Sequence, residues 1–397
     1  MSLIAGSHVS TLFDSVAAGK ELVSTAMRPF SNAQPLCAIV YSTVCHDQQQ
    51  LLRTVRSTIG NQVCVLGCST QGISGRGVFS EASYVAGIML LGGTSLVAKA
   101  DRQAEINVNT YEKGKRLAET IQTGLGQEPK VIILHYDPLV GANMEGLLAG
   151  IGSVVNAPII GGGAAQPWGP MTRTFQYFST EVTSNSVVAV GLAGLFDVHT
   201  CFSHGTEPTG LTMRVTRAEG NAILELDGQP ALDVWNEITG SGTNKIRSVD
   251  ETAAWAVGIA LGQGHRGTNA IRAAFGFDTE KGSILLQVPI VTGTEVMFHH
   301  RTVETVLDGT AAMGLKMAES LKGRQAKAFI GFECGARTTP FLGLNCSQRE
   351  NLDLQQRLGM DAAWLGMLAW GEIAPFAGKP EFFNYTYPLL ALAESSQ

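Results

Sequence analysis

A short apolar stretch in the first quarter of the chain ends in a run of small polar residues. Residues 63–67 are typical of a buried strand, and Cys68, Ser69 and Thr70 follow directly. Small side chains at such a turn leave room for a ligand, and their hydroxyl and amide groups can donate hydrogen bonds to a carboxylate or phosphate. We expect these three residues to line a ligand cavity. The alternative is a tight turn with its small side chains packed inside.

Two further polar positions follow a predicted strand at 326–332. Cys334 and Arg337 lie there on a glycine-containing turn. The planar guanidinium of arginine suits a ligand carboxylate, which it can bind with two hydrogen bonds. We expect both residues to bind ligand. A salt bridge from Arg337 to Glu333 or Glu372 is the structural alternative.

Glu372 ends another apolar run, at 364–372, where an unpaired carboxylate would be costly. It is a candidate to bind a ligand ammonium, to hold Arg337 or to act as a general base. Gly162 lies in a triple glycine at 161–163, which we interpret as a turn that lines the ligand site or packs closely. Neither a dinucleotide fingerprint nor a Walker A pattern is present. We expect Cys68, Ser69, Thr70, Cys334, Arg337 and Glu372 to converge on one cavity.

Composition and charge exclude several classes of protein. The chain has 397 residues, of which 45% are hydrophobic and 16% charged, with 46 glycines and a net charge of −6. This balance gives no electrostatic footprint for nucleic acid, and no apolar run is long enough to span a membrane. No secretory signal is readable, so we expect a cytoplasmic protein whose seven cysteines are free thiols. No Cys-x-x-Cys occurs, and we expect no metal site.

The order of elements predicts an α/β (α+β) fold with layered mixed β-sheets and outer helices. A helix is expected over 8–30, strands near 63–67 and 84–91, and a long helix over 303–321. After residue 200 the pattern changes to hairpins, including one around 219–221. We expect two domains, 1–215 and 216–397. The first half also suggests an internal duplication, because 63–70 parallels 158–163 and 84–92 parallels 186–194.

Four segments together resemble the FIST family of sensory domains, named for F-box and intracellular signal transduction proteins. They are 66–72 (LGCSTQG), 205–210 (GTEPTG), 332–337 (FECGAR) and 370–375 (WGEIAP). The resemblance implies an N-terminal and a C-terminal FIST domain that bind a small polar metabolite such as an amino acid. The chain departs from the family pattern at His204, Thr206, Glu207 and Trp370. No kinase or cyclase module is readable, so we expect signalling through a separate partner protein.

Two other functions remain open at this level. One is a hydrolase or transferase with Cys68 or Cys334 as nucleophile, which would need a base within hydrogen-bond reach. No catalytic signature is readable, which favours a binding protein over an enzyme. The other is a haem-binding nitric oxide sensor, since some FIST-like proteins are described as such. His204 is then the best candidate for the axial ligand, because it lies beside a family segment.

Overall fold

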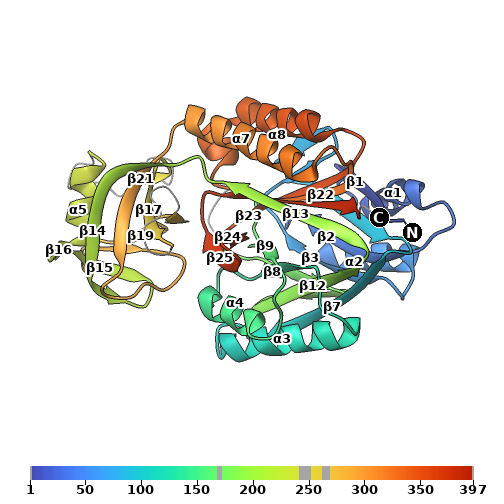
Figure 1. Ribbon diagram of the computed structural model, residues 1–397, viewed down its shortest axis with the longest axis horizontal. Coiled ribbons are helices and arrows are strands. Elements are labelled where there is room, and N and C mark those ends of the chain that lie inside the picture. The colour runs from blue at the N-terminus through green and yellow to red at the C-terminus, as the bar shows by residue number, and fades with distance from the viewer. Residues whose placement is uncertain (1, 168–171, 241–251, 262–268, 396–397) are drawn as a thin grey trace.

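The computed structural model describes residues 2–167, 172–240, 252–261 and 269–395. Within these residues, three six-stranded sheets form the body of the molecule, and a fourth sheet lies to one side of it (Figure 1). The first sheet has the order β1 (Ile4–Ser10), β6 (Ala86–Gly92), β2 (Pro35–Ser42), β3 (Cys64–Ser69), β10 (Gln176–Phe178) and β11 (Glu181–Thr183). The second has the order β7 (Leu96–Ala104), β12 (Ser186–Gly194), β8 (Val131–Tyr136), β9 (Ile159–Gly163), β24 (Glu372–Phe376) and β25 (Lys379–Phe383). The third has the order β13 (Phe196–Ser203), β26 (Tyr387–Glu394), β22 (Ala326–Cys334), β23 (Ala363–Ala369), β4 (Ile73–Gly75) and β5 (Val78–Ser80).

The three sheets have the same topology. In each, the third and fourth strands of the order above run parallel to one another, and every other neighbouring pair is antiparallel. Each parallel pair is joined by a helix: α2 (Gln48–Ile59), α4 (Met144–Gly152) or α8 (Leu344–Leu358). The duplication that the sequence suggested is therefore present, and it extends to a third copy formed by β13 and β22–β26.

Each copy gives its hairpin to another copy's sheet. The β4–β5 hairpin of the first copy joins β23 of the third. The β10–β11 hairpin of the second joins β3 of the first, and the β24–β25 hairpin of the third joins β9 of the second. Three backbone hydrogen bonds repeat this cycle: Gln71 N to Leu368 O (3.3 Å), Ala165 N to Ser69 O (2.9 Å) and Trp370 N to Gly163 O (3.1 Å). No copy completes its sheet by itself.

The apolar side chains of the three-sheet body form one shared interior and three outer layers. The interior cluster draws residues from all three sheets. One pair of helices covers the outside of each sheet, and these are α1 (Ser15–Ala26) with α2, α3 (Thr110–Leu125) with α4, and α7 (Val303–Leu321) with α8. Helices therefore lie outside and the sheets meet inside, as the sequence predicted.

The fourth sheet is an insertion into the third copy, between β13 and α7. We call it the inserted sheet; it contains β14 (Glu207–Glu219), β15 (Ala222–Leu226), β16 (Gln229–Pro230), β17 (Trp255–Ala260), β18 (Asn269–Arg272), β19 (Gly276–Asp278), β20 (Ser283–Leu285) and β21 (Glu295–His300). Helix α5 (Ala231–Ile238) packs on it around Trp235. The two chain ends lie together on the other side of the body, where Leu3 N donates to Glu394 Oε1 at 3.4 Å (Figure 1).

Local predictions hold best where a cap or turn defines the element. The 303–321 helix begins and ends as expected, and β14 and β15 meet at Gly220. The predicted helix over 8–30 is wrong at its start. Residues 4–10 form β1, which pairs antiparallel with β6 along its whole length, and the helix begins only after Asp14 caps it through Ala17 N.

One glycine recurs at the same place in the second strand of each parallel pair: Gly67, Gly161 and Gly366. A Cβ at Gly161 would lie 1.9 Å from the carbonyl oxygen of Leu134 on the paired strand. We therefore expect Gly161→Ala to lower the free energy of unfolding by about 2–3 kcal/mol, because the backbone of β8 must move. Urea unfolding measures this change.

Gly152→Ala is the matched control, because nothing lies within 4 Å of a Cβ built there at the end of α4. Alanine favours a helix over glycine, so this variant should be unchanged or more stable by up to about 1 kcal/mol. Equal stabilities for the two variants would contradict the close approach at Gly161.

Candidate functional site

Cys68 lies in the packed interior where the three sheets meet. It is opposite Tyr41 in register, and its sulfur lies 3.7 Å from the sulfur of Met367. Tyr41 in turn contacts His135, with 3.4 Å between the hydroxyl and Nε2. Burial raises the pKa of Cys68 and of Tyr41 and lowers the pKa of His135 to about 3. The Cys68 thiol therefore stays protonated in this structure.

Ser69 and Thr70 lie where the chain leaves the first sheet for the third. Ser69 Oγ accepts a hydrogen bond from Phe175 N at 3.0 Å. Thr70 Oγ1 donates to Gly72 O at 2.7 Å and accepts from Leu368 N at 3.0 Å. Their hydroxyl groups thus fasten the exchanged hairpins to the neighbouring sheets.

Gly162, Cys334 and Glu372 lie together beside the inserted sheet. Glu372 is opposite Gly162 in register. Its carboxylate accepts hydrogen bonds from the N–H groups of Gly371 and Thr386, both at 3.1 Å, and from the Cys334 thiol. Burial is the main cause that raises the pKa of both Cys334 and Glu372. Alanines 256 and 273 and other apolar residues of the inserted sheet cover the thiol.

Arg337 belongs to a separate buried ion cluster on the other face of β22. Its Nη2 lies 2.7 Å from Glu350 Oε1, and its Nε lies 3.7 Å from Glu333 Oε1. It also donates to Thr310 Oγ1 at 2.8 Å. Burial alone would lower the pKa of Arg337, but Glu350 and Glu333 outweigh it and the pKa is raised. Of its expected carboxylate partners, Arg337 therefore pairs with Glu333, whereas Glu372 is held by backbone N–H groups.

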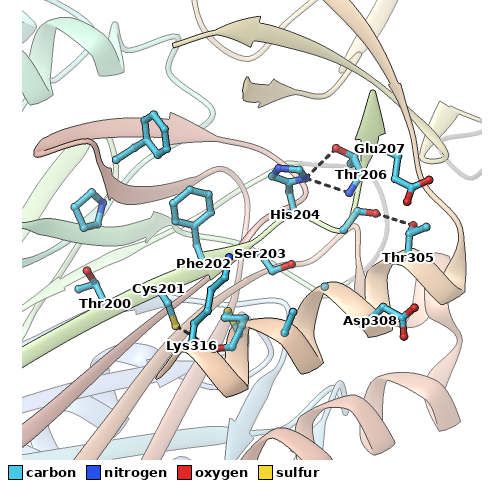
Figure 2. A pocket seen from close by; sticks show the side chains of 16 residues that line it. Thr200, Cys201, Phe202, Ser203, His204, Thr206, Glu207, Thr305, Asp308 and Lys316 are labelled. Carbon is cyan, nitrogen blue, oxygen red and sulfur yellow. Dashed lines mark hydrogen bonds between the residues drawn. The ribbon is translucent and has the colours of Figure 1, made fainter. Parts of the chain in front are cut away.

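A pocket of about 720 Å³ opens between β13 and α7, at the root of the inserted sheet (Figure 2). We call it the root pocket. Residues 200–207 form one wall, and the first four turns of α7 form another. Lys316 reaches from α7 toward β13, while Glu207 and Asp308 lie at the exposed rim (Figure 2). Opposite charges and several hydroxyl groups therefore border one cavity.

Two glycines allow the root pocket's walls to meet. A Cβ at Gly309 would lie 2.5 Å from Ser203 Oγ, and one at Gly205 would lie 2.5 Å from Val306 Cα. Gly205 also has φ of +62°, a conformation that side chains disfavour. Thr305 Oγ1 donates to the Gly205 carbonyl at 2.8 Å. This contact fixes the segment that enters the inserted sheet against the start of α7.

His204 lines the root pocket, and its Nδ1 accepts a hydrogen bond from Thr206 N at 3.1 Å (Figure 2). Burial, helped by the neighbouring His299, lowers its pKa to about 4. Because Nδ1 is an acceptor, the proton of the neutral ring is on Nε2. An axial haem ligand needs an unprotonated nitrogen, so His204 in this arrangement does not fit haem iron. Among the described residues, no cluster of three His, Cys, Asp or Glu side chains is placed to hold a metal ion.

Sequence reasoning did not single out the α7 residues of the root pocket. The signal was present, because Thr305, Asp308, Ala312 and Lys316 follow one another at intervals of three or four and so share one face of the predicted helix. These residues face β13, which lies more than 100 positions earlier in the chain. Nothing local indicated that these two segments pack together.

The Arg337 cluster predicts a large effect of substitution on stability. Arg337→Met leaves Glu333 and Glu350 buried without their cation, so we expect a loss of about 3–5 kcal/mol in the free energy of unfolding. Arg214→Met is the control, because Arg214 and Glu295 form a pair with side chains 62% and 63% exposed. That variant should lose less than about 1 kcal/mol. Chemical denaturation measures both; a small effect at Arg337 would contradict the cluster.

His135 predicts a pH dependence. Its pKa is about 3 in the folded protein and about 6.5 in an unfolded chain. Between these two pH values only the unfolded state takes up the proton. Above pH 6.5 His135 therefore does not lower the free energy of unfolding, and below it the free energy of unfolding falls as the pH is lowered. We expect His135→Gln to reduce this slope by about 1.4 kcal/mol per pH unit between pH 6 and 4. Urea midpoints at several pH values, each compared with pH 8, measure it; parallel curves would contradict the prediction.

None of the helices in the described parts of the chain is both long and apolar enough to cross a bilayer. The chain is similar to several uncharacterized proteins. They include MJ1623 of Methanocaldococcus jannaschii, 30% identical over 44% of this chain and 35% of its own length. Mb0898c of Mycobacterium bovis is 29% identical over 54% and 55%, and Rv0628c of Mycobacterium tuberculosis is 24% identical over 96% and 97%. The match thus spans about a third to a half of the first two relatives.

Solved structures give only distant similarity. A cyanuric acid hydrolase from A. caulinodans aligns over all of both chains with a TM-score of 0.37 and 7% identity. PurLQS from Thermotoga maritima has a TM-score of 0.23 and 11% identity, over all of this chain and 72% of that one. The family profiles are decisive, because the FIST N domain matches residues 37–229 and the FIST C domain matches residues 231–375. The chain therefore belongs to the FIST family, as its four short motifs had indicated.

Proposed function

We propose that this protein is a cytoplasmic sensor that binds a small amino-acid-like metabolite in the root pocket and reports its presence to a separate partner protein. The observation that carries the proposal is the pocket's border of opposite charges on two different elements. Lys316 is a point charge suited to a carboxylate, and Glu207 and Asp308 are suited to an ammonium group. A zwitterion carries both groups.

The position of the root pocket supports a sensory role. Its walls contain the segment by which the chain enters the inserted sheet, at 203–207, and the start of α7, just after the chain returns from that sheet. A ligand that contacts both walls favours one arrangement of the inserted sheet relative to the body. A partner protein that contacts both the sheet and the body would distinguish the occupied from the empty state.

The free state of the cysteines supports a location in a reducing cellular compartment. All seven are free, and Cys45 is exposed. Disulfides are rare in the cytoplasm, where thiols are kept reduced, so this pattern agrees with the proposed location.

An enzyme is the second candidate, and one observation favours it. Glu372 is a potential base within hydrogen-bond reach of the Cys334 thiol. Burial raises the pKa of both groups, however, and a reactive cysteine needs a lowered pKa and access. If Cys334 is a nucleophile, iodoacetamide should alkylate it as fast as the exposed Cys45 in the native protein. We expect alkylation at Cys45 and none at the buried Cys334, measured by peptide mass spectrometry.

Calorimetric titration with the twenty L-amino acids tests the proposed function. We expect at least one to bind, and Lys316→Met to weaken its binding by about 1.5–3 kcal/mol, because the carboxylate loses its cation. Lys327→Met is the control, since Lys327 lies on β22 outside the pocket and pairs with Glu394. Absence of binding by every amino acid, or equal affinity of Lys316→Met and wild type, would refute the proposal.

A further inference from the structure

We infer that His204 determines the specificity of the root pocket, and that it selects amino acids whose side chain carries a hydrogen-bond acceptor, with a carboxamide favoured over a carboxylate. This inference rests on the proposed function. The evidence is a chain of four polar side chains that runs from the inserted sheet to the pocket and fixes the position of each proton along it.

The direction of these hydrogen bonds is determined first at Asn269, the end of the series that lies in the inserted sheet. Asn269 on β18 places its amide nitrogen 2.8 Å from Nε2 of His299 on β21. An amide N–H can only donate, so Nε2 of His299 is an acceptor and the ring proton is on Nδ1. His299 Nδ1 lies 3.1 Å from Thr206 Oγ1, and it therefore donates to that oxygen.

The remaining two bonds follow from the first. With its oxygen accepting from His299, the Thr206 hydroxyl donates to Nδ1 of His204 at 2.9 Å. The Thr206 backbone N–H donates to the same nitrogen at 3.1 Å, which independently requires Nδ1 of His204 to accept. Both arguments leave the proton of His204 on Nε2.

The surroundings hold this arrangement in place. Thr206 and His299 are buried, and the two imidazole rings meet edge to face with 6.3 Å between their centres. At position 258 even a Cβ would come within 2.5 Å of His299 Nε2, so the ring fills the space beside β17. Both histidines have pKa values lowered to about 4, chiefly by burial, so both rings are neutral at neutral pH. His204 then has one polar group left for a ligand, the Nε2–H donor.

A fixed donor discriminates by chemistry. It binds a carbonyl or carboxylate oxygen and opposes an ammonium or an apolar group, which would leave the N–H unpaired. The charged residues of the pocket, Lys316, Glu207 and Asp308, sum to one negative charge. This excess disfavours a second carboxylate on the ligand and favours a neutral carboxamide.

Matched pairs of amino acids test the inference by calorimetry. L-asparagine and L-leucine have nearly the same shape but differ in the acceptor, and L-glutamine and L-methionine are similar in length and differ in the same way. We expect the carboxamide of at least one pair to bind at least tenfold more tightly than its apolar counterpart. L-aspartate should bind more weakly than L-asparagine, and L-glutamate more weakly than L-glutamine.

Three variants identify the residue responsible. His204→Phe should reduce the carboxamide preference to about onefold, while His204→Gln should retain part of it, because its amide can accept from Thr206 N and donate to the ligand. Thr206→Val, in which the positioning hydroxyl is missing, should lie between them. Nitrogen-15 NMR of the ligand-free protein should show His204 protonated on Nε2 and His299 on Nδ1, as the hydrogen bonds of Thr206 and Asn269 require.

The outcomes separate the two proposals. If amino acids bind without any carboxamide preference, or if His204→Phe keeps the preference, the specificity inference is wrong and the proposed function stands. Protonation of His204 on Nδ1 has the same consequence. If none of the amino acids binds, the proposed function fails and the inference fails with it.

Discussion

The fold depends on three backbone hydrogen bonds at the places where the chain crosses from one sheet to the next. Gln71, Ala165 and Trp370 each donate to the strand end of another copy. Because each of the three exchanged hairpins pairs with a strand far away in sequence, burial of the interior and closure of the three sheets depend on one another. The hydroxyls of Ser69 and Thr70 add to the same crossings. Residues that resemble a ligand site in sequence are thus occupied in joining the copies.

The inserted sheet breaks the equivalence of the three copies. It is placed in only one of them, and the polar groups that remain unexplained by the repeat gather where it joins the body: the Cys334–Glu372 pair, the Arg337 cluster and the root pocket. A repeated scaffold supplies rigidity, and a single insertion supplies the asymmetry that a specific binding site needs. The buried ion pair of Arg337 and Glu350 lies next to this junction.

How far the sequence predicts this structure depends on the distance between interacting residues. The α7 helix follows from its own apolar face and its capping threonine, and the β14–β15 hairpin follows from alternation around Gly220. The β1 strand was missed because its small and polar residues have no regular alternation and Val9 continues the apolar spacing of the helix that follows. Exchange of hairpins lies beyond local reasoning, because the β4–β5 hairpin pairs with β23, nearly 300 positions later in the chain. Arg337 shows the same limit: its chemistry is readable, but its main partner, Glu350, lies on a helix whose packing is not.

The adjacency of the two chain ends has a practical consequence for observing this molecule. Both lie on the side of the body opposite the inserted sheet (Figure 1). A reporter fluorophore attached at either end would leave the root pocket unobstructed. A second fluorophore on the exposed turn between β14 and β15, in the inserted sheet, would lie on the other side of the body from the first. Energy transfer between the two dyes would then read any displacement of the inserted sheet as a change in one long distance.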